Sequence, residues 1–205
     1  MRIIHAGTAI GLASVLSACA SLPASEPVLT VLTTDAGRMV VDVDIAHAPI
    51  SGCNFLRYVA SGAYDGGSFF RTVVAATNAN PNPIDVIQAA TPAGSDDPGF
   101  GPIALERTRD TGLRHLAGTI SLARDGPDTA TSSVFIVTQD TPSLDFGGRR
   151  NPDGQGFAAF GRLLEGLDIA RAIQAMPADA EEQLTPPVVI RSARLIGRLP
   201  AECGL

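Results

Sequence analysis

The chain has 205 residues, a length typical of one domain that buries a sizeable core. Its 21 Gly and 15 Pro residues indicate many turns, and we therefore expect a β-rich fold. The formal net charge is −6, and all 15 basic residues are Arg, without a long basic cluster. This charge balance argues against a nucleic acid as partner.

Residues 1–18 have the pattern of a secretory signal peptide. Arg2 and His5 precede an apolar run over residues 6–16, which is too short to span a bilayer as a mature helix. The run ends in Leu16-Ser17-Ala18-Cys19, which resembles the bacterial lipobox. In such signals the Cys becomes the first mature residue and carries lipid, whereas an ordinary cleavage site beside an incidental Cys is the alternative.

From this resemblance we predict lipidation at Cys19, followed by a linker over residues 19–27. Ala20, rather than Asp, follows the Cys, which favours the outer membrane. We expect a periplasmic protein whose lipid anchor is its one contact with the membrane, since two lipid signals suffice for firm anchoring.

The first elements of the domain are predicted to be a β-hairpin and a helix. Residues 28–33 and 38–44 are apolar and alternating segments that flank a turn at Asp35-Ala36-Gly37. Ala48-Pro49-Ile50 then begins a helix, because Pro is tolerated in the first turn, and Gly62 is a plausible end.

The run Tyr64-Asp-Gly-Gly-Ser-Phe-Phe-Arg71 leads into a predicted strand over residues 68–74. Because alternate side chains of a strand share a face, we expect Phe69, Arg71 and Val73 on one side. Arginine is permanently charged and carries five donors in a rigid fork, which suits an amide that must be held and polarised. The alternative is an amphipathic strand with a surface charge.

The remaining chain continues the β pattern, with residues 91–114 mostly as loop. We predict a helix over 166–176 and further strands over 84–88, 118–124, 133–138, 157–162 and 188–199. About eight strands and two helices favour a closed eight-stranded antiparallel barrel with two capping helices. The predicted domain spans residues 28–199, and residues 200–205 form a tail.

If Cys19 carries lipid, Cys53 and Cys203 are the two cysteines with a free thiol. An oxidising compartment would allow a disulfide between them. Cys53 lies in the predicted helix, however, and packing as an ordinary core residue is equally open.

Short motifs along the chain are weak alone but specific in their order and spacing. They are Asn54-Phe55-Leu56, the run over 64–71, Val86-Ile87-Gln88, the run over 118–124, Phe135-Ile136, Ser143-Leu144-Asp145 and Phe160-Gly161. In these motifs, from about residue 28 to 198, the sequence resembles the cyclophilin-type peptidyl-prolyl cis-trans isomerases.

The resemblance implies a barrel with an external proline groove, acting as a monomer on proline-containing polypeptides without cofactor or metal. By position, Arg71 matches the catalytic arginine and Gln88 matches the glutamine that supports it. The other implied substrate-binding residues are Phe69, Val86, Phe135 and Leu144 in the proline pocket, Ala123 and Arg124 on the strand that pairs with the substrate, and Phe157.

These residue types suit bond rotation. The barrier of an X–Pro bond, about 18–20 kcal/mol, comes from amide resonance. Twisting breaks the resonance and localises a lone pair on the prolyl nitrogen, so a donor aimed there acts only in the twisted state. Arg71 is the candidate donor, and an apolar pocket would exclude water.

The sequence also departs from the family pattern. Asp85 replaces an aromatic residue and is close enough in sequence to pair with Arg71, Ala89-Ala90 replaces Gly-Gly, and Ser132-Ser133 replaces Ser-Gln. The departures at Asp85 and Ser133 support an alternative function, a low-activity or non-catalytic chaperone module that binds proline segments. The retained Arg71, Gln88 and Phe135 argue against it, and we expect an isomerase that acts on folding envelope proteins.

Other chemistries find little support. His47 and His115 lie apart without metal-ligand spacing, and Ser132 lacks the context of a hydrolase nucleophile. Asp145 is interpreted as a turn former and Arg149-Arg150 as a solvated loop.

Overall fold

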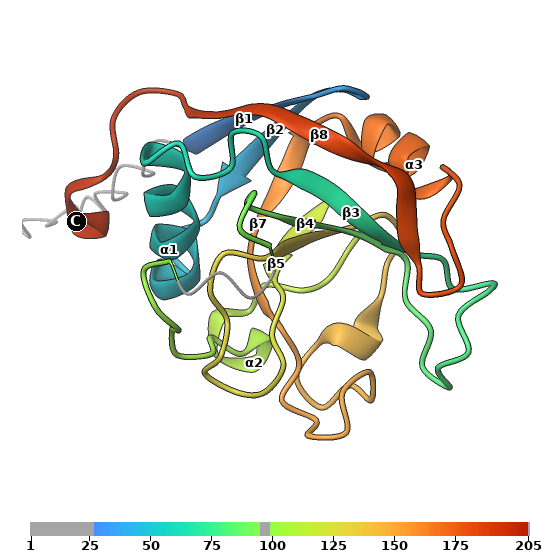
Figure 1. Cartoon of the computed structure of the whole chain (residues 1–205). Coiled ribbons are helices and arrows are strands. Elements are labelled where there is room, and N and C mark those ends of the chain that lie inside the picture. The colour runs from blue at the N-terminus through green and yellow to red at the C-terminus, as the bar shows by residue number, and fades with distance from the viewer. Residues whose placement is uncertain (1–26, 95–98, 205) are drawn as a thin grey trace, which may run out of the picture.

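The computed structural model describes residues 27–94 and 99–204; the predicted signal peptide and Cys19 lie outside them. Eight antiparallel strands close into a barrel in the order β1-β2-β7-β5-β6-β4-β3-β8, which confirms the predicted fold class (Figure 1). The strands are β1 (Val28–Thr34), β2 (Gly37–Val43), β3 (Ser68–Val73), β4 (Val86–Ala90), β5 (Thr119–Leu122), β6 (Val134–Val137), β7 (Ala158–Glu165) and β8 (Gln183–Leu195).

The two predicted helices lie at opposite ends of the barrel, as Figure 1 shows. They are α1 (Pro49–Ala60), with Pro49 in the first turn, and α3 (Leu167–Gln174). One further helical turn, α2 (Thr108–Thr111), interrupts the long predicted loop, and short 3-10 segments span Pro142–Leu144 and Ala201–Cys203. Among the described residues, no helix has the length and apolar character needed to cross a membrane.

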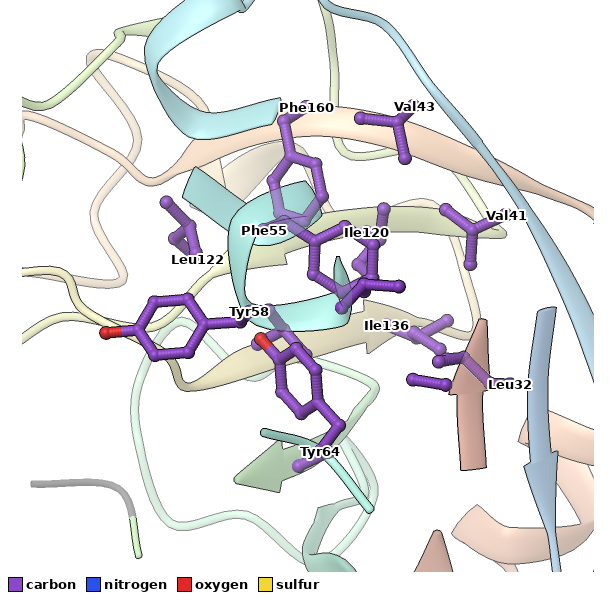
Figure 2. Close-up of a cluster of buried hydrophobic side chains, with 14 of the residues drawn as sticks. Leu32, Val41, Val43, Phe55, Tyr58, Tyr64, Ile120, Leu122, Ile136 and Phe160 are labelled. Carbon is purple, nitrogen blue, oxygen red and sulfur yellow. The ribbon is translucent and has the colours of Figure 1, made fainter. Parts of the chain in front are cut away.

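The barrel interior is filled by aromatic and aliphatic side chains (Figure 2). Phe55 from α1 is at the centre, with its ring centroid 5.2 Å from that of Phe160 and 5.6 Å from that of Tyr64. All three side chains are at most 1% exposed. α1 therefore closes its end of the barrel by inserting side chains between the strands.

A second apolar cluster lies on the outer surface of the barrel. Alternation along β4 sends Ile87 into the interior and Val86 outward, and along β6 it sends Ile136 inward and Phe135 outward. The outward residues join a separate buried cluster consisting of Val73, Ile84, Val86, Phe135, Val137 and Leu144, against which Ala123 and Phe157 pack. An apolar surface is thereby built outside the main core.

A β-bulge in β3 corrects one prediction. Opposite β4, Phe69 pairs with Ala89 and Arg71 pairs with Gln88, so Phe70 is an extra residue in the ladder. The bulge turns Phe69 into the interior, where it is 0% exposed, while Arg71 faces outward. The expectation that Phe69 and Arg71 share one face, and that Phe69 lines the proline pocket, is therefore wrong.

A disulfide joins the C-terminal segment to helix α1. Cys53 of α1 and Cys203 are bonded, with their Cα atoms 4.8 Å apart. Figure 1 shows the final segment running from β8 back to α1. This resolves the alternatives that the sequence left open for the two cysteines.

Candidate active site

A cleft of about 280 Å³ lies on the outer face of the barrel, over the second apolar cluster. The strands β3, β4 and β6 form its floor, and the segments that follow β5 and precede β7 form its rim. Of the residues predicted for the site, the cleft brings together Arg71, Val86, Gln88, Ala123, Arg124, Phe135, Leu144 and Phe157. Phe69 is the one that lies elsewhere.

One part of the cleft is apolar. Phe135 and Phe157 meet edge to face, with ring centroids 5.3 Å apart and an interplanar angle of 89°. Val86 and Leu144 complete the hollow and are 3% and 1% exposed. Because these side chains are fixed by packing, the pocket can accept a small apolar ring without rearrangement.

Behind Phe135 lies a buried polar group of three residues. The His115 ring stacks on the Phe135 ring, with a centroid separation of 5.9 Å. Its Nδ1 is 2.8 Å from Asp145 Oδ1 and its Nε2 is 3.1 Å from Ser121 Oγ. The arrangement resembles a hydrolytic triad, but Ser121 is 0% exposed and no substrate can reach its hydroxyl. The group instead supports the back of the pocket.

Arg71 stands beside this pocket and is oriented by Gln88. The Nη1 group of Arg71 donates to Gln88 Oε1 at 3.2 Å. Gln88 Nε2 in turn donates to Ser133 Oγ at 3.1 Å, and the Ser133 hydroxyl donates to the carbonyl oxygen of Ala89. Since the hydroxyl proton is directed to Ala89, Ser133 Oγ accepts from the amide of Gln88, and the Gln88 oxygen must face Arg71.

Glu182, the residue immediately before β8, holds the other side of the guanidinium. Arg71 Nη2 donates to Glu182 Oε2, and Asn78 Nδ2 donates to Glu182 Oε1 at 2.5 Å. Glu182 adopts a positive φ of 66°, an uncommon conformation that the Thr72 N–H stabilises by donating to its carbonyl oxygen. Arg71 is thus fixed between partners from two different segments.

The predicted pairing of Asp85 with Arg71 is wrong. Val86 and Gln88 face the cleft, so Asp85, one residue earlier, faces the other way. Its carboxylate accepts from the Ala75 N–H and from Gln174 Nε2, both at 3.0 Å.

Two further arginines contribute to the rim. The side chain of Arg124 is 1% exposed, and its guanidinium donates to Asp153 and to the Gly156 carbonyl oxygen. The hydrogen bonds from Arg124 hold the pKa of Asp153 below its usual value. Arg149 is exposed, as a solvated loop predicts, but Arg150 is half-buried and lines the cleft. No pattern in the sequence distinguishes the exposed Arg149 from the half-buried Arg150.

Among residues 27–94 and 99–204, no group of three His, Cys, Asp or Glu side chains is placed to hold a metal ion. What the cleft offers is an apolar hollow with a fixed arginine beside it, on the outer face of a closed barrel.

The comparisons with known proteins are specific. The family described as "Cyclophilin type peptidyl-prolyl cis-trans isomerase/CLD" matches residues 28–195. The chain therefore belongs to the cyclophilin-type peptidyl-prolyl cis-trans isomerases.

Similar proteins carry the same family name. "Peptidyl-prolyl cis-trans isomerase cyp18" of Streptomyces antibioticus is 35% identical over 173 residues, covering 81% of this chain and 97% of the relative. "Peptidyl-prolyl cis-trans isomerase A" of Dickeya dadantii is 36% identical over 170 residues, covering 80% of this chain and 83% of the relative. A crystal structure of a Cryptosporidium parvum cyclophilin-type isomerase superimposes with a TM-score of 0.66 at 20% identity, covering 84% of this chain and 99% of that one, and supports the fold.

Proposed function

We propose that this protein accelerates rotation about X–Pro peptide bonds in polypeptides that fold in the cell envelope. The observation that carries the proposal is the placement of Arg71, held by Gln88 at the edge of the pocket formed by Phe135, Leu144 and Phe157. Two relatives bear the name peptidyl-prolyl cis-trans isomerase, and a similar C. parvum protein was crystallised in the presence of the dipeptide Ala-Pro.

In this mechanism the pyrrolidine ring occupies the apolar hollow and the residue before it rotates. Nη1 of Arg71 donates to Gln88 and Nη2 donates to Glu182. Each of these two nitrogens carries two N–H groups and so keeps one, and Nε carries a further N–H. A donor therefore remains for the prolyl nitrogen as its lone pair localises. Because the partners of Arg71 are in place before substrate binds, little reorganisation is needed in the transition state.

Arg71→Ala tests the proposal. Loss of a preorganised donor costs about 10²- to 10³-fold in rate, and we expect a fall in kcat/KM of about that size. The measurement is a chymotrypsin-coupled assay on an X–Pro peptide, with Arg149→Ala as a control that removes an exposed arginine outside the cleft. Turnover unchanged by Arg71→Ala would remove this residue from the mechanism.

The alternative is a module that grips proline segments with little turnover. Its sequence support was the replacement at Ser133 and the presence of Asp85. Ser133 Oγ accepts from Gln88 and so orients it, and Asp85 is directed away from Arg71. Neither departure obstructs the site, which favours catalysis. Tight binding of an X–Pro peptide without faster isomerisation would instead establish the alternative.

We further propose a periplasmic location with a lipid anchor at Cys19 in the outer membrane. The Cys53–Cys203 bond supports an oxidising compartment, because such bonds are rare where thiols are kept reduced. Cys19→Ser should release the protein from membranes into the soluble fraction. A Cys19→Ser protein that still sediments with membranes would contradict the anchor.

A further inference from the structure

A continuous hydrogen-bonded row of four polar side chains connects two arginines that line the cleft. Arg71 and Asn78 both donate to the carboxylate of Glu182. Arg150 Nη1 then donates to Asn78 Oδ1 at 2.9 Å and to the carbonyl oxygen of Asn82 at 3.3 Å. The row joins the candidate catalytic arginine to a second arginine on the rim of the same cleft.

The positive charges of the three arginines that line the cleft are unequally compensated. Arg71 is paired with Glu182, and Arg124 is paired with Asp153. Within the described parts of the chain, Arg150 has only neutral oxygens as partners and no ion pair. Asp125, an acidic residue that does line the cleft, is exposed and has no ion pair within the described residues either.

The surroundings of Arg150 disfavour its isolated charge. Partial burial lowers the pKa of Arg150, the positive charge of Arg71 lowers it further, and Glu182 opposes these effects in part. An anion that entered the cleft would favour the charged form of Arg150 and so offset the cost of its burial and of the repulsion from Arg71.

The guanidinium of Arg150 is positioned to receive such an anion. Both of its hydrogen bonds come from Nη1, so Nη2 and Nε keep their donors. The planar fork matches the two oxygens of a carboxylate. Asn78 and Asn82 fix the group in place, which reduces the entropy lost on binding.

We propose that Arg150 is a specificity-determining residue that binds the carboxylate of an Asp or Glu side chain near the isomerised proline. The inference rests on the proposed isomerase function, because the proline pocket sets where the peptide lies. Since Arg150 lines the same cleft as Phe135 and Leu144, the acidic residue is placed within about two residues of the proline. Substrates would thus be acidic X–Pro segments.

Matched peptides that differ by Glu against Gln test the proposal. The pairs carry the exchange one or two residues before or after a single proline. Binding is measured by NMR titration and isomerisation by NMR exchange, which requires no protease. The proteins are wild type, Arg150→Gln and Arg149→Gln; the two variants lose the same charge, but Arg149 is exposed and outside the cleft lining.

For the wild type and Arg149→Gln we expect the Glu peptide to be preferred about three- to tenfold in at least one position. In Arg150→Gln the preference should vanish. Equal affinity for Glu and Gln peptides at every position in the wild type would overturn the proposal. A preference that survives in Arg150→Gln, or that is lost equally in Arg149→Gln, would overturn it as well. Absence of catalysis with every peptide would refute the isomerase function alone, since the titrations still decide the role of Arg150.

Discussion

The most informative single change in the cleft is Glu182→Gln. Arg71 and Asn78 donate to different oxygens of the Glu182 carboxylate, so in a glutamine one of these two donors would face an NH2 group, which cannot accept its hydrogen bond. The negative charge beside Arg71 is also removed. The backbone hydrogen bond from Thr72 to residue 182 does not involve the side chain, and we therefore expect the variant to fold.

The size of the effect follows from the exposure of the pair. The side chains of Arg71 and Glu182 are 30% and 24% exposed, which is between a surface ion pair and a buried one. Surface pairs contribute about 0.2–1 kcal/mol, whereas breaking a buried pair costs about 3–5 kcal/mol. For this partly exposed pair, we expect the lost interaction energy to be about 1 kcal/mol after screening by solvent. Because Arg71 then becomes less well oriented, kcat/KM should fall roughly fivefold.

The assay is the isomerisation of a neutral X–Pro peptide, with Glu181→Gln as a control. Glu181 is the neighbouring exposed glutamate, so the control makes the same change in net charge without touching Arg71. A rise in kcat/KM for Glu182→Gln would refute the reasoning. It would mean that Glu182 competes with substrate for Arg71 rather than orienting it.

Reduction of the Cys53–Cys203 bond should lower the free energy of unfolding by about 5 kcal/mol in the chain-entropy model, because it closes a loop with a sequence separation of 150. Guanidinium denaturation with and without reductant measures this, and equal stability would contradict it. His115→Ala should leave a cavity behind Phe135 and raise KM more than it lowers kcat; an unchanged KM would exclude the supporting role. The folded-state pKa of Asp153 is lowered by Arg124, so this pair stabilises the fold above about pH 4. That contribution should disappear as pH falls through the lowered value, and Asp153→Asn should be less sensitive to acid than the wild type in pH-dependent unfolding.

Local sequence patterns were sufficient for most of the barrel. The alternation over residues 38–44 correctly indicated the half-buried strand β2, and the order of the short motifs correctly brought Val86 and Gln88 to the cleft. Pro49 in the first turn of α1 marked the start of the helix. These features depend on residues within one element, and they can be found without knowledge of the partner strands.

The misplacement of Phe69 has its physical origin in the extra residue at Phe70. An alternation rule assumes an uninterrupted ladder, and one added residue reverses the face of every side chain beyond it. Nothing in Ser68-Phe69-Phe70-Arg71 marks the bulge. The rule therefore placed Phe69 in the cleft when the bulge turns it into the core.

Contacts between residues far apart in the sequence could not be predicted either. Glu182 is separated from Arg71 by 111 residues, and no motif links them. The same is true of Asn78 with Arg150, and of Cys53 with Cys203, for which both pairing and packing were open. Charge alone directed attention to Asp85, which is nearer in sequence but on the wrong face of its strand.

The residues that orient Arg71 directly differ from Arg150, the residue that we propose selects the substrate. On one side, Gln88 and Ser133 belong to the barrel strands or their immediate ends, and their hydrogen-bond directions leave one orientation for the amide. On the other side, Asn78, Arg150 and Glu182 come from connecting segments outside the paired core of the sheet, and loops tolerate change more readily than strands. Under the proposal for Arg150, a substitution there would alter which peptide side chains the cleft attracts, while Arg71 keeps its direct partners Gln88 and Glu182.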